Sequence, residues 1–234
     1  RSEVVLSRIY SAVDERLLFT SIEAAEMVKY ADNVWHATKV AFANEVGRLC
    51  KALDIDSHDV MNIFVKDLKL NLSPYYLKPG FAFGGSCLPK EVRAVGHLAA
   101  DLGVEVPLID SLMPSNERHV AQALKLLTPF AGKRVGFLGV TFKPGTDDLR
   151  ESPTLDVMSS LLADGFEILA YDPNLRFGPT LQGQIDYVRH AVPRQAALMD
   201  RLELIAMPSA DEFLAGCDVI VVSHATDEFR SIVA

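Results

Sequence analysis

A glycine-rich segment of the chain ends in a single cysteine. Residues 84–90 read Gly-Gly-Ser-Cys-Leu-Pro-Lys. Glycine adopts positive φ without strain and lets the backbone approach a ligand closely, so Cys87 is expected in the open rather than in a core. The ammonium of Lys90 would favour the thiolate form. The pattern predicts that Cys87 is a nucleophile, whereas Cys50 and Cys217 lie in helix and strand patterns and are expected to be structural.

A lysine and an asparagine four residues apart form a second candidate pair. Lys29 and Asn33 would share one face of a helix, and that face continues to His36 and Asn44. An ammonium and a carboxamide together can stabilise a developing oxyanion. A solvated polar stripe is the alternative interpretation, and the pair alone does not decide between the two.

Two further cations follow an apolar run of strand length. Residues 142–150 read Phe-Lys-Pro-Gly-Thr-Asp-Asp-Leu-Arg. In doubly wound sheets, ligands bind at the carboxyl ends of the strands, where Lys143 and Arg150 could hold a phosphate. A solvent-facing turn with compensating charges is an equally good interpretation. Residues 136–139, Gly-Phe-Leu-Gly, lack the GxGxxG spacing of a dinucleotide site.

The composition argues against several classes of function. The 234 residues carry a net charge of −8, which disfavours binding to nucleic acid but not to a small phosphorylated ligand. No run of about 18 apolar residues suggests a membrane span. The three cysteines are far apart, so we expect neither a metal site nor a disulfide framework. Free cysteines are typical of a reducing compartment, so we expect a cytoplasmic location. The chain opens on Arg1, from which we expect either a removed leader or a longer polypeptide.

The first half of the chain carries helical patterns. We expect a short amphipathic helix over residues 1–13, a short strand over 17–19, and a capping box over 20–23 with Thr20 as the N-cap. Apolar residues then recur at helical spacing, which predicts one helix over about 21–54. A helix that long extends past one small core and is expected to bridge domains or subunits. Further helices are predicted at 56–68, 90–102 and 109–127.

The second half changes pattern. Apolar runs of strand length at 133–140, 167–171 and 218–222 alternate with helical patterns at 153–164 and 211–215. Buried strands that alternate with helices predict a parallel, doubly wound sheet. The expected fold class is therefore α/β: an all-helical central region with a long helix, followed by a Rossmann-like parallel α/β domain. The expected domains are residues 1–20, 21–128 and 129–234.

Three motifs together resemble the nucleotide-sugar 6-dehydrogenases, the family of the UDP-glucose and GDP-mannose enzymes. They are Gly84-Gly85-Ser86-Cys87-x-Pro-Lys90, Lys29-x-x-x-Asn33 and Phe142-Lys143-x-x-Thr146-x-Asp148-x-Arg150-x-Ser152. The family begins with an NAD-binding Rossmann domain, so the resemblance implies that this chain is the C-terminal part of that architecture. It makes residues 1–20 the remnant of the NAD-binding domain, 21–128 a dimerisation domain, and 129–234 a sugar-nucleotide-binding domain.

The resemblance implies a four-electron, NAD-dependent oxidation. Cys87 would attack the C6 aldehyde of the sugar to form a thiohemiacetal, and a second hydride transfer would give a thioester that water hydrolyses. Lys29 and Asn33 would stabilise the C6 oxygen. Glu91 stands where the family usually has aspartate, which helps to position the water and the lysine.

The resemblance also implies the binding residues and the assembly. Lys90 and Arg150 match NAD contacts. The implied substrate contacts are Lys29, Asn33, His36, Asn44, Tyr75, Tyr76, Lys78, Phe81, Gly84 and Lys143. In the family the long helix forms the dimer core, and the sites combine residues of two subunits. A homodimer or higher homo-oligomer is therefore expected.

A few residues bear on the choice of substrate. Residues 67–71 read Asp-Leu-Lys-Leu-Asn, where the UDP-glucose enzymes usually carry Asp-x-Arg-Ile-Gly. Ala82 replaces a usual glycine, and Leu88 follows the cysteine. This combination favours the GDP-mannose branch, which supplies GDP-mannuronate for alginate.

Three alternatives stay open. The first is a UDP-glucose 6-dehydrogenase. The second is a β-hydroxyacid dehydrogenase, which also uses a Lys-x-x-x-Asn pair but needs no nucleophilic cysteine. The third concerns the chain by itself, which would be inactive and act only in dimerisation and nucleotide-sugar binding.

Overall fold

The computed structural model describes residues 2–11, 17–73, 80–224 and 226–233. The chain divides into two compact units, Arg1–Met61 and Asn62–Ala234, and each is described by itself. Among the described residues, no helix is both long enough and apolar enough to cross a bilayer. The predicted domain limits after residues 20 and 128 stay predictions.

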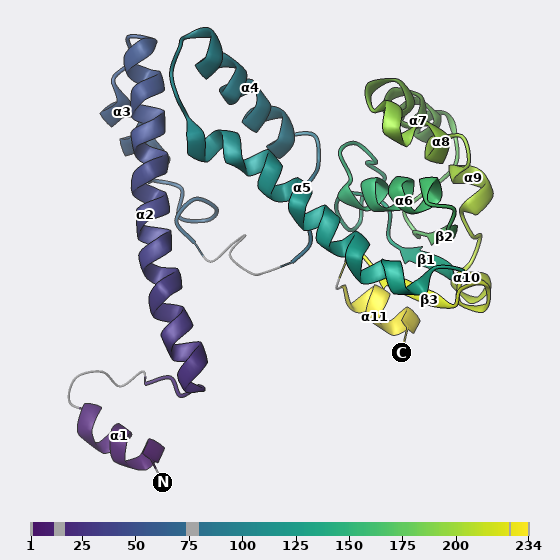
Figure 1. The fold of residues 1–234 in the computed structure, drawn as a ribbon, viewed down its shortest axis with the longest axis horizontal. Helices are drawn as coiled ribbons and strands as arrows, with labels where there is room; N and C mark the ends of the chain where they lie inside the picture. The colour runs from purple at the N-terminus through teal and green to yellow at the C-terminus, as the bar shows by residue number, and fades with distance from the viewer. Residues whose placement is uncertain (1, 12–16, 74–79, 225, 234) are drawn as a thin grey trace. The chain divides into compact units, whose positions relative to one another are not determined.

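The first unit is dominated by one long helix. Helix α1 spans Ser2–Tyr10, and α2 spans Ile22–Ala52 without a break (Figure 1). At 31 residues α2 is about 46 Å long. It ends in a left-handed turn at Asp54, where φ is 57°, and the amide of Ile55 donates to the carbonyl of Cys50 at 2.8 Å. The long helix predicted from the apolar spacing is confirmed.

Two predictions at the start of α2 were wrong. The N-cap is Ser21 rather than Thr20: Ser21 is the last extended residue, and its hydroxyl accepts a hydrogen bond from the amide of Ala24 at 3.2 Å. A hydrogen bond from its own backbone amide and, to a smaller extent, one from the Ser21 hydroxyl lower the pKa of Glu23. Residues 17–19 have no strand structure, because a strand needs a neighbour to pair with and the described part of the first unit contains none.

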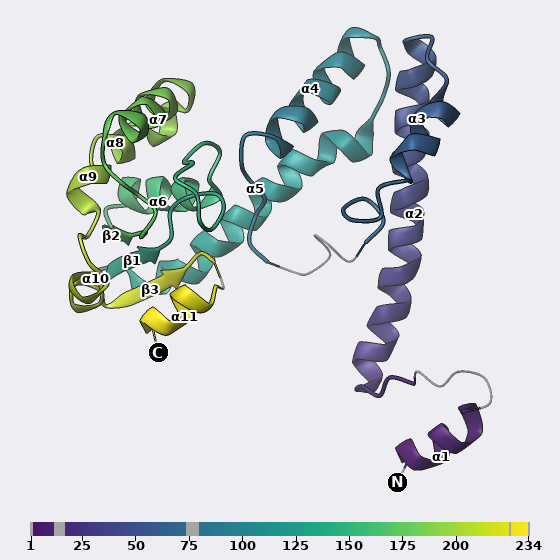
Figure 2. The same cartoon turned by 180° about the vertical axis from the view of Figure 1, so that it is seen from behind.

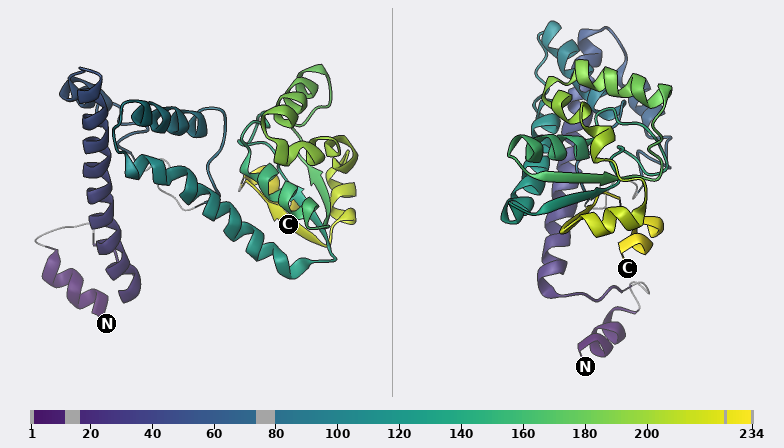
Figure 3. Two further views of the ribbon diagram at one scale, coloured as in Figure 1. Left: turned by 45° about the horizontal axis from the view of Figure 1, so that its top comes forward. Right: turned by 90° about the vertical axis from the view of Figure 1, so that its right-hand side faces the viewer.

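Helix α3, Ser57–Phe64, and then the pair α4, Leu88–Asp101, and α5, Pro107–Leu127, lead into the second unit. Helix α3 lies across the division between the units and ends four residues before the predicted Leu68. The Asp67 carboxylate accepts hydrogen bonds from the amides of Lys69 and Leu70, both at 2.9 Å, which favours a turn over further helix. Helices α4 and α5 lie side by side (Figure 3).

Both helices of this pair begin two residues before their predicted starts. Pro89 and Pro107 occupy the first turns of α4 and α5. A proline is tolerated there because the missing N–H would have no partner within the helix. Both prolines therefore belong to the helices.

The α/β domain is built on three parallel strands. The strands are β1 Arg134–Leu138, β2 Glu167–Tyr171 and β3 Val219–Val222, in the spatial order β2-β1-β3 (Figure 2). Val135 of β1 lies opposite Ile168 on one side and Val219 on the other. A central strand with two parallel neighbours confirms the sheet that the apolar runs predicted.

Helices cover both faces of the sheet. On one face, Val135 and Phe137 belong to a core shared with α5, α6 (Pro153–Ala163), α7 (Pro179–Ala191), α8 (Ala196–Met199) and α9 (Leu202–Ile205). On the other face, Leu138 packs with α10 (Ala210–Gly216) and α11 (Asp227–Val233), and Figures 1 and 2 both show α11 beside β3. The short 3-10 helices Thr128–Phe130 and Pro193–Gln195 complete the domain. A helical region followed by a doubly wound α/β domain confirms the predicted fold class.

Candidate active site

Cys87 sits at the N-terminus of α4. It is the residue before the first helical position, and its carbonyl accepts a hydrogen bond from the amide of Glu91 at 2.9 Å. The thiol is free and exposed, and the Ser86 hydroxyl lies 3.9 Å from its Sγ. The N-terminus of a helix carries a partial positive charge that favours an anion. The structure therefore gives Cys87 the accessible, electropositive setting that a thiolate nucleophile needs.

A cavity of about 1250 Å³ opens beside this cysteine. Its walls come from three parts of the second unit: residues 80–88, one face of α5, and the turn after β1. Cys87, Phe81, Gly84 and Lys143 line it, and α5 contributes Leu112, Ser115, Asn116, Arg118 and His119. Ligand pockets commonly measure about 300–1,000 Å³, so this cavity has room for a nucleotide sugar.

Two side chains of α5 hold the segment before the cysteine. The Asn116 carboxamide accepts from the amide of Phe83 at 2.9 Å and donates to the carbonyl of the same residue at 2.8 Å. The His119 Nε2 lies 2.7 Å from the carbonyl oxygen of Gly80, and its ring is 6.3 Å from that of Phe81. Residues 80–83 are therefore fixed along one wall of the cavity.

The glycines before Cys87 lie against the α/β domain. Gly85 has φ of +86°, and a Cβ there would lie 2.6 Å from the Phe142 ring. A Cβ on Gly84 would overlap the backbone carbonyl of Glu151. The amide of Gly85 donates to that same carbonyl at 3.2 Å. This close approach of two backbones is the reason for glycine at both positions.

Two cations act electrostatically on Cys87. Lys90 is paired with Glu91 at 3.0 Å, and its pKa is raised mainly by that carboxylate and to a smaller extent by Cys87. Arg150 binds Asp148 through two side-chain hydrogen bonds at 2.7 and 2.9 Å. Its pKa is raised mainly by Asp148, with smaller contributions from other groups that include Cys87.

The predicted site residues fall into three groups. The structure brings Cys87, Phe81, Gly84 and Lys143 together on the cavity, with Lys90, Glu91 and Arg150 outside its lining. Lys29 and Asn44 are exposed on α2 in the first unit. Asn33 and His36 belong to the same helix, and their side chains are not among those described. Tyr75, Tyr76 and Lys78 lie outside the described residues. The roles assigned to all of these residues stay predictions.

The sequence analysis did not identify the residues whose hydrogen bonds hold the segments around the cavity in place. Asn116 and His119 are three residues apart on α5, a spacing that places both on one helix face and could have signalled a shared role. Arg93 and Glu151, which form an ion pair with two hydrogen bonds at 2.7 and 3.0 Å, lie 58 positions apart, and no local pattern relates them.

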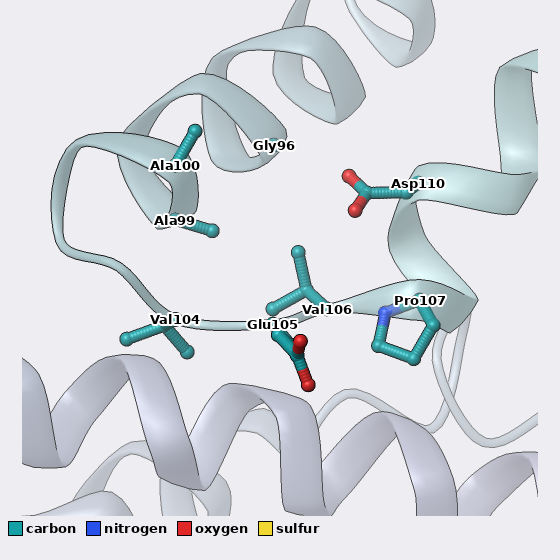
Figure 4. A pocket seen from close by; sticks show the side chains of 8 residues that line it. All are labelled: Gly96, Ala99, Ala100, Val104, Glu105, Val106, Pro107 and Asp110. Carbon is teal, nitrogen blue, oxygen red and sulfur yellow. The ribbon is translucent and has the colours of Figure 1, made fainter.

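A second hollow, of about 490 Å³, lies where α4 connects to α5. Figure 4 shows small and apolar side chains around it, with the carboxylates of Glu105 and Asp110. Its lining includes neither a cysteine nor a cation. Among the described residues, no group of three His, Cys, Asp or Glu side chains could hold a metal ion. The Cys87 cavity is therefore the candidate active site.

The fold and the site define a class of protein. A helical region joins a Rossmann-like α/β domain, and an accessible thiol at a helix N-terminus lines a large cavity beside the carboxyl end of β1. The central-domain model of the UDP-glucose/GDP-mannose dehydrogenase family matches residues 23–118, and the family's UDP-binding-domain model matches residues 136–234. The chain belongs to the UDP-glucose/GDP-mannose dehydrogenase family.

Several relatives carry specific names. The GDP-mannose 6-dehydrogenases of Pseudomonas putida and Pseudomonas aeruginosa are 41% and 42% identical over 97% and 98% of this chain. The UDP-glucose 6-dehydrogenase of Haloferax volcanii is 30% identical over 99% of it. The matches cover 50–51% of these relatives, so the chain spans about half the length of the proteins that it matches.

Solved structures give the same assignment. A ternary complex of GDP-mannose dehydrogenase from Pseudomonas aeruginosa is 40% identical, covers 99% of this chain with a TM-score of 0.87, and is itself covered over 52% of its length. A UDP-glucose dehydrogenase from Pyrobaculum islandicum is 30% identical, covers 98% of this chain with a TM-score of 0.54, and is covered over 50% of its length.

Proposed function

We propose that this chain forms the central and nucleotide-sugar-binding part of an NAD-dependent GDP-mannose 6-dehydrogenase. The observation that carries the proposal is Cys87, an exposed thiol at a helix N-terminus on a cavity of about 1250 Å³. Identities of 41–42% to GDP-mannose enzymes, against 30% to a UDP-glucose enzyme, support the GDP-mannose branch. The product would be GDP-mannuronate, a precursor of alginate.

The proposed chemistry removes four electrons from C6 of the sugar. The C6 alcohol first loses a proton and a hydride and becomes an aldehyde. The Cys87 thiolate then adds to the aldehyde carbon, and protonation of the oxygen gives a thiohemiacetal. Loss of a second hydride and a proton gives a thioester. Water then adds to the thioester carbon and the C–S bond breaks, which releases the carboxylate, the thiolate and the two protons of the water. NAD, when bound, accepts one hydride in each oxidation, two for each product.

The remaining catalytic roles fall on side chains that can handle charge and protons. Lys29 and Asn33 supply donors for the negative charge on the C6 oxygen. Glu91 orients the hydrolytic water, as a carboxylate can. The covalent adduct on Cys87 divides one difficult oxidation into two easier steps.

The proposed cofactor contacts are Lys90 and Arg150. Their side chains are 68% and 46% exposed, and an ammonium and a guanidinium suit the pyrophosphate of NAD. Cys87 contributes a small part of the raised pKa of each cation, so a cofactor held by them would lie near the proposed nucleophile. The proposed substrate contacts are Lys29, Asn33, His36, Asn44, Tyr75, Tyr76, Lys78, Phe81, Gly84 and Lys143.

The proposal includes an assembly and a location. The length of α2 supports a homodimer whose sites combine residues of two subunits. The absence of a helix that could span a bilayer among the described residues is compatible with the cytoplasmic location that we propose.

The proposal is tested in an enzyme that joins this chain to the NAD-binding domain of the Pseudomonas aeruginosa relative. We expect NADH formation with a kcat/KM for GDP-mannose at least about tenfold above that for UDP-glucose, and two NADH for each GDP-mannuronate. Cys87→Ser should stop carboxylate formation, while Cys217→Ser, the matched control, should leave it intact.

Each alternative predicts a different result. A preference for UDP-glucose would support a UDP-glucose 6-dehydrogenase instead. Aldehyde oxidation that survives Cys87→Ser would favour the β-hydroxyacid dehydrogenase interpretation, which needs no nucleophilic cysteine. Binding of GDP-mannose by calorimetry, without NADH from either sugar nucleotide, would leave only dimerisation and nucleotide-sugar binding.

A further inference from the structure

Glu151 holds the segment before Cys87 through a backbone hydrogen bond. Its φ of 53° lies in the left-handed region, which residues other than glycine rarely adopt. In this conformation its carbonyl oxygen accepts a hydrogen bond from the amide of Gly85 at 3.2 Å. Only the lack of a Cβ on Gly84 lets that backbone come so close. The backbone of Glu151 therefore fixes the turn just before the cysteine.

The side chain of Glu151 contacts the helix after the cysteine. The Arg93 guanidinium on α4 donates from Nη1 to Oε1 at 2.7 Å and from Nη2 to Oε2 at 3.0 Å. Two parallel hydrogen bonds restrict both distance and orientation, which a single ion pair does not. The hydrogen bonds to Glu151 are the main cause of the raised pKa of Arg93.

Cys87 lies between these two attachments, two residues after Gly85 and six before Arg93. Both attachments lead to Glu151, which directly precedes Ser152 and Pro153 at the start of α6. We propose that Arg93 and Glu151 are positioning residues: their bidentate pair, with the Glu151 carbonyl, fixes the Cys87 thiol relative to the α/β domain and its Lys143. The inference rests on the proposed role of Cys87 as the nucleophile.

A merely structural role for the pair predicts something different. In that case removing Arg93 would lower global stability without a specific effect on the turn at Gly85 or on turnover by the folded enzyme. A suitable control is Arg194, which also donates two hydrogen bonds to one carboxylate, that of Asp156, at 2.9 and 3.1 Å. Among the described residues that line the Cys87 cavity, Arg194 is not included.

The first experiment uses the complete 234-residue chain. Hydrogen exchange of the Gly85 amide should be at least about fivefold faster in Arg93→Ala than in the parent. Without Arg93, the Glu151 carbonyl that accepts the Gly85 hydrogen bond loses its orientation. Arg194→Ala should leave the exchange rate of the Gly85 amide within about twofold of its rate in the parent. If Arg93→Ala leaves the Gly85 rate unchanged, or if both variants raise it equally, the proposal is overturned.

The second experiment uses the joined enzyme. Arg93→Ala should lower kcat for GDP-mannose at least about tenfold while KM changes less than about twofold, because substrate still binds but the thiol is misplaced. Arg93→Lys should not restore kcat, since an ammonium cannot make the bidentate contact. Unchanged kcat in Arg93→Ala, or full recovery with lysine, contradicts the proposal.

Two provisions keep the result decisive. If Arg93→Ala does not fold, Glu151→Gln carries the same measurements: it keeps the backbone and the side-chain length but weakens the pair, so the same shifts are expected. If the joined parent enzyme oxidises neither sugar nucleotide, the proposed function fails, while hydrogen exchange at Gly85 still decides whether Arg93 holds the turn.

Discussion

The three cysteines of this chain differ in exposure, and exposure sets their chemistry. Cys87 is exposed at a helix N-terminus, Cys50 is buried at 6% exposure, and burial raises the pKa of the partly covered Cys217 thiol. A raised thiol pKa means less thiolate at neutral pH, and the thiolate is the form that reacts.

We therefore predict that iodoacetamide at pH 7.5 labels Cys87 at least about tenfold faster than Cys50 or Cys217. Peptide mass spectrometry over a time course measures all three rates in one sample. The chain denatured in urea is the control, because its three thiols should react at similar rates. Equal labelling in the folded chain would remove the basis for a nucleophilic role.

The Asp148–Arg150 pair makes stability depend on pH. Hydrogen bonds from Arg150 lower the pKa of Asp148. A lowered pKa in the folded state stabilises the protein above the unfolded value, about 3.9, and the effect is lost as the pH falls through the folded value. We predict that Asp148→Asn lowers the free energy of unfolding by up to about 1 kcal/mol at pH 7, with a difference that shrinks below about pH 4.

Urea titrations of parent and variant at pH 7, 5, 4 and 3 measure this difference. Asp147→Asn is the matched control, because no ion pair of Asp147 is found among the described residues. The pair assignment is wrong if the two variants behave alike, or if the Asp148→Asn difference is the same at every pH.

At the scale of single residues, local chemistry could be predicted and long-range support could not. The glycines and the proline around Cys87 indicated an open thiol, and the structure places it on a cavity. Asn116 and Glu151 were not found, because their partners lie 33 and 66 positions away along the chain. Only the packing of α4, α5 and the turn before α6 brings those partners together.

At the scale of elements, the turn before α4 depends on the absence of a side chain. Gly85 and Gly165 both have positive φ, +86° and +83°, but a Cβ on Gly85 would meet the Phe142 ring at 2.6 Å while Gly165 has open space. Gly165→Ala should therefore lower the free energy of unfolding only by the strain of placing alanine at positive φ, about 1–2 kcal/mol. Gly85→Ala should lower the free energy of unfolding by about 1–3 kcal/mol more, because the Phe142 ring must move to make room for the Cβ.

Thermal or urea unfolding of the two variants separates these terms. The packing explanation requires the larger loss in Gly85→Ala, together with faster labelling or altered reactivity of Cys87 as the turn loosens. Equal losses in both variants would mean that the contact with Phe142 contributes nothing.

The strength of the local signal decided which elements the sequence could predict. Strands β1, β2 and β3 are short, and after a charged first residue in β1 and β2 they are apolar and mostly buried or half-buried, so their patterns were clear. The sequence analysis made no prediction for helix α7, although its buried residues Leu181, Ile185 and Val188 keep helical spacing. Pro179 and Gly183 weaken the helical signal there. Helices α8 and α9 have four residues each, too few to show a period.

At the scale of the whole molecule, the long helix presents more apolar surface than its own unit covers. Val28 and Trp35 are seven residues apart, so they share a face of α2, and they are 56% and 42% exposed. Exposed apolar side chains on one face of a long helix are typical of a surface that a partner covers. The proposed homodimer supplies that partner as a second copy of the chain.

We predict that the chain, 25.7 kDa as a single copy, sediments at twice that mass at micromolar concentration. Val28→Glu combined with Trp35→Glu should convert it to single copies, because two carboxylates on each subunit would be buried without partners in the interface. Leu204→Glu is the control: Leu204 is 83% exposed on α9, and its replacement should leave the mass unchanged. Circular dichroism should show equal helix content in all three proteins, so that a loss of mass reports the interface rather than unfolding. A parent chain that sediments as one copy, or a dimer that survives both glutamates, would remove α2 from the proposed assembly and with it the expectation that each site draws residues from two subunits.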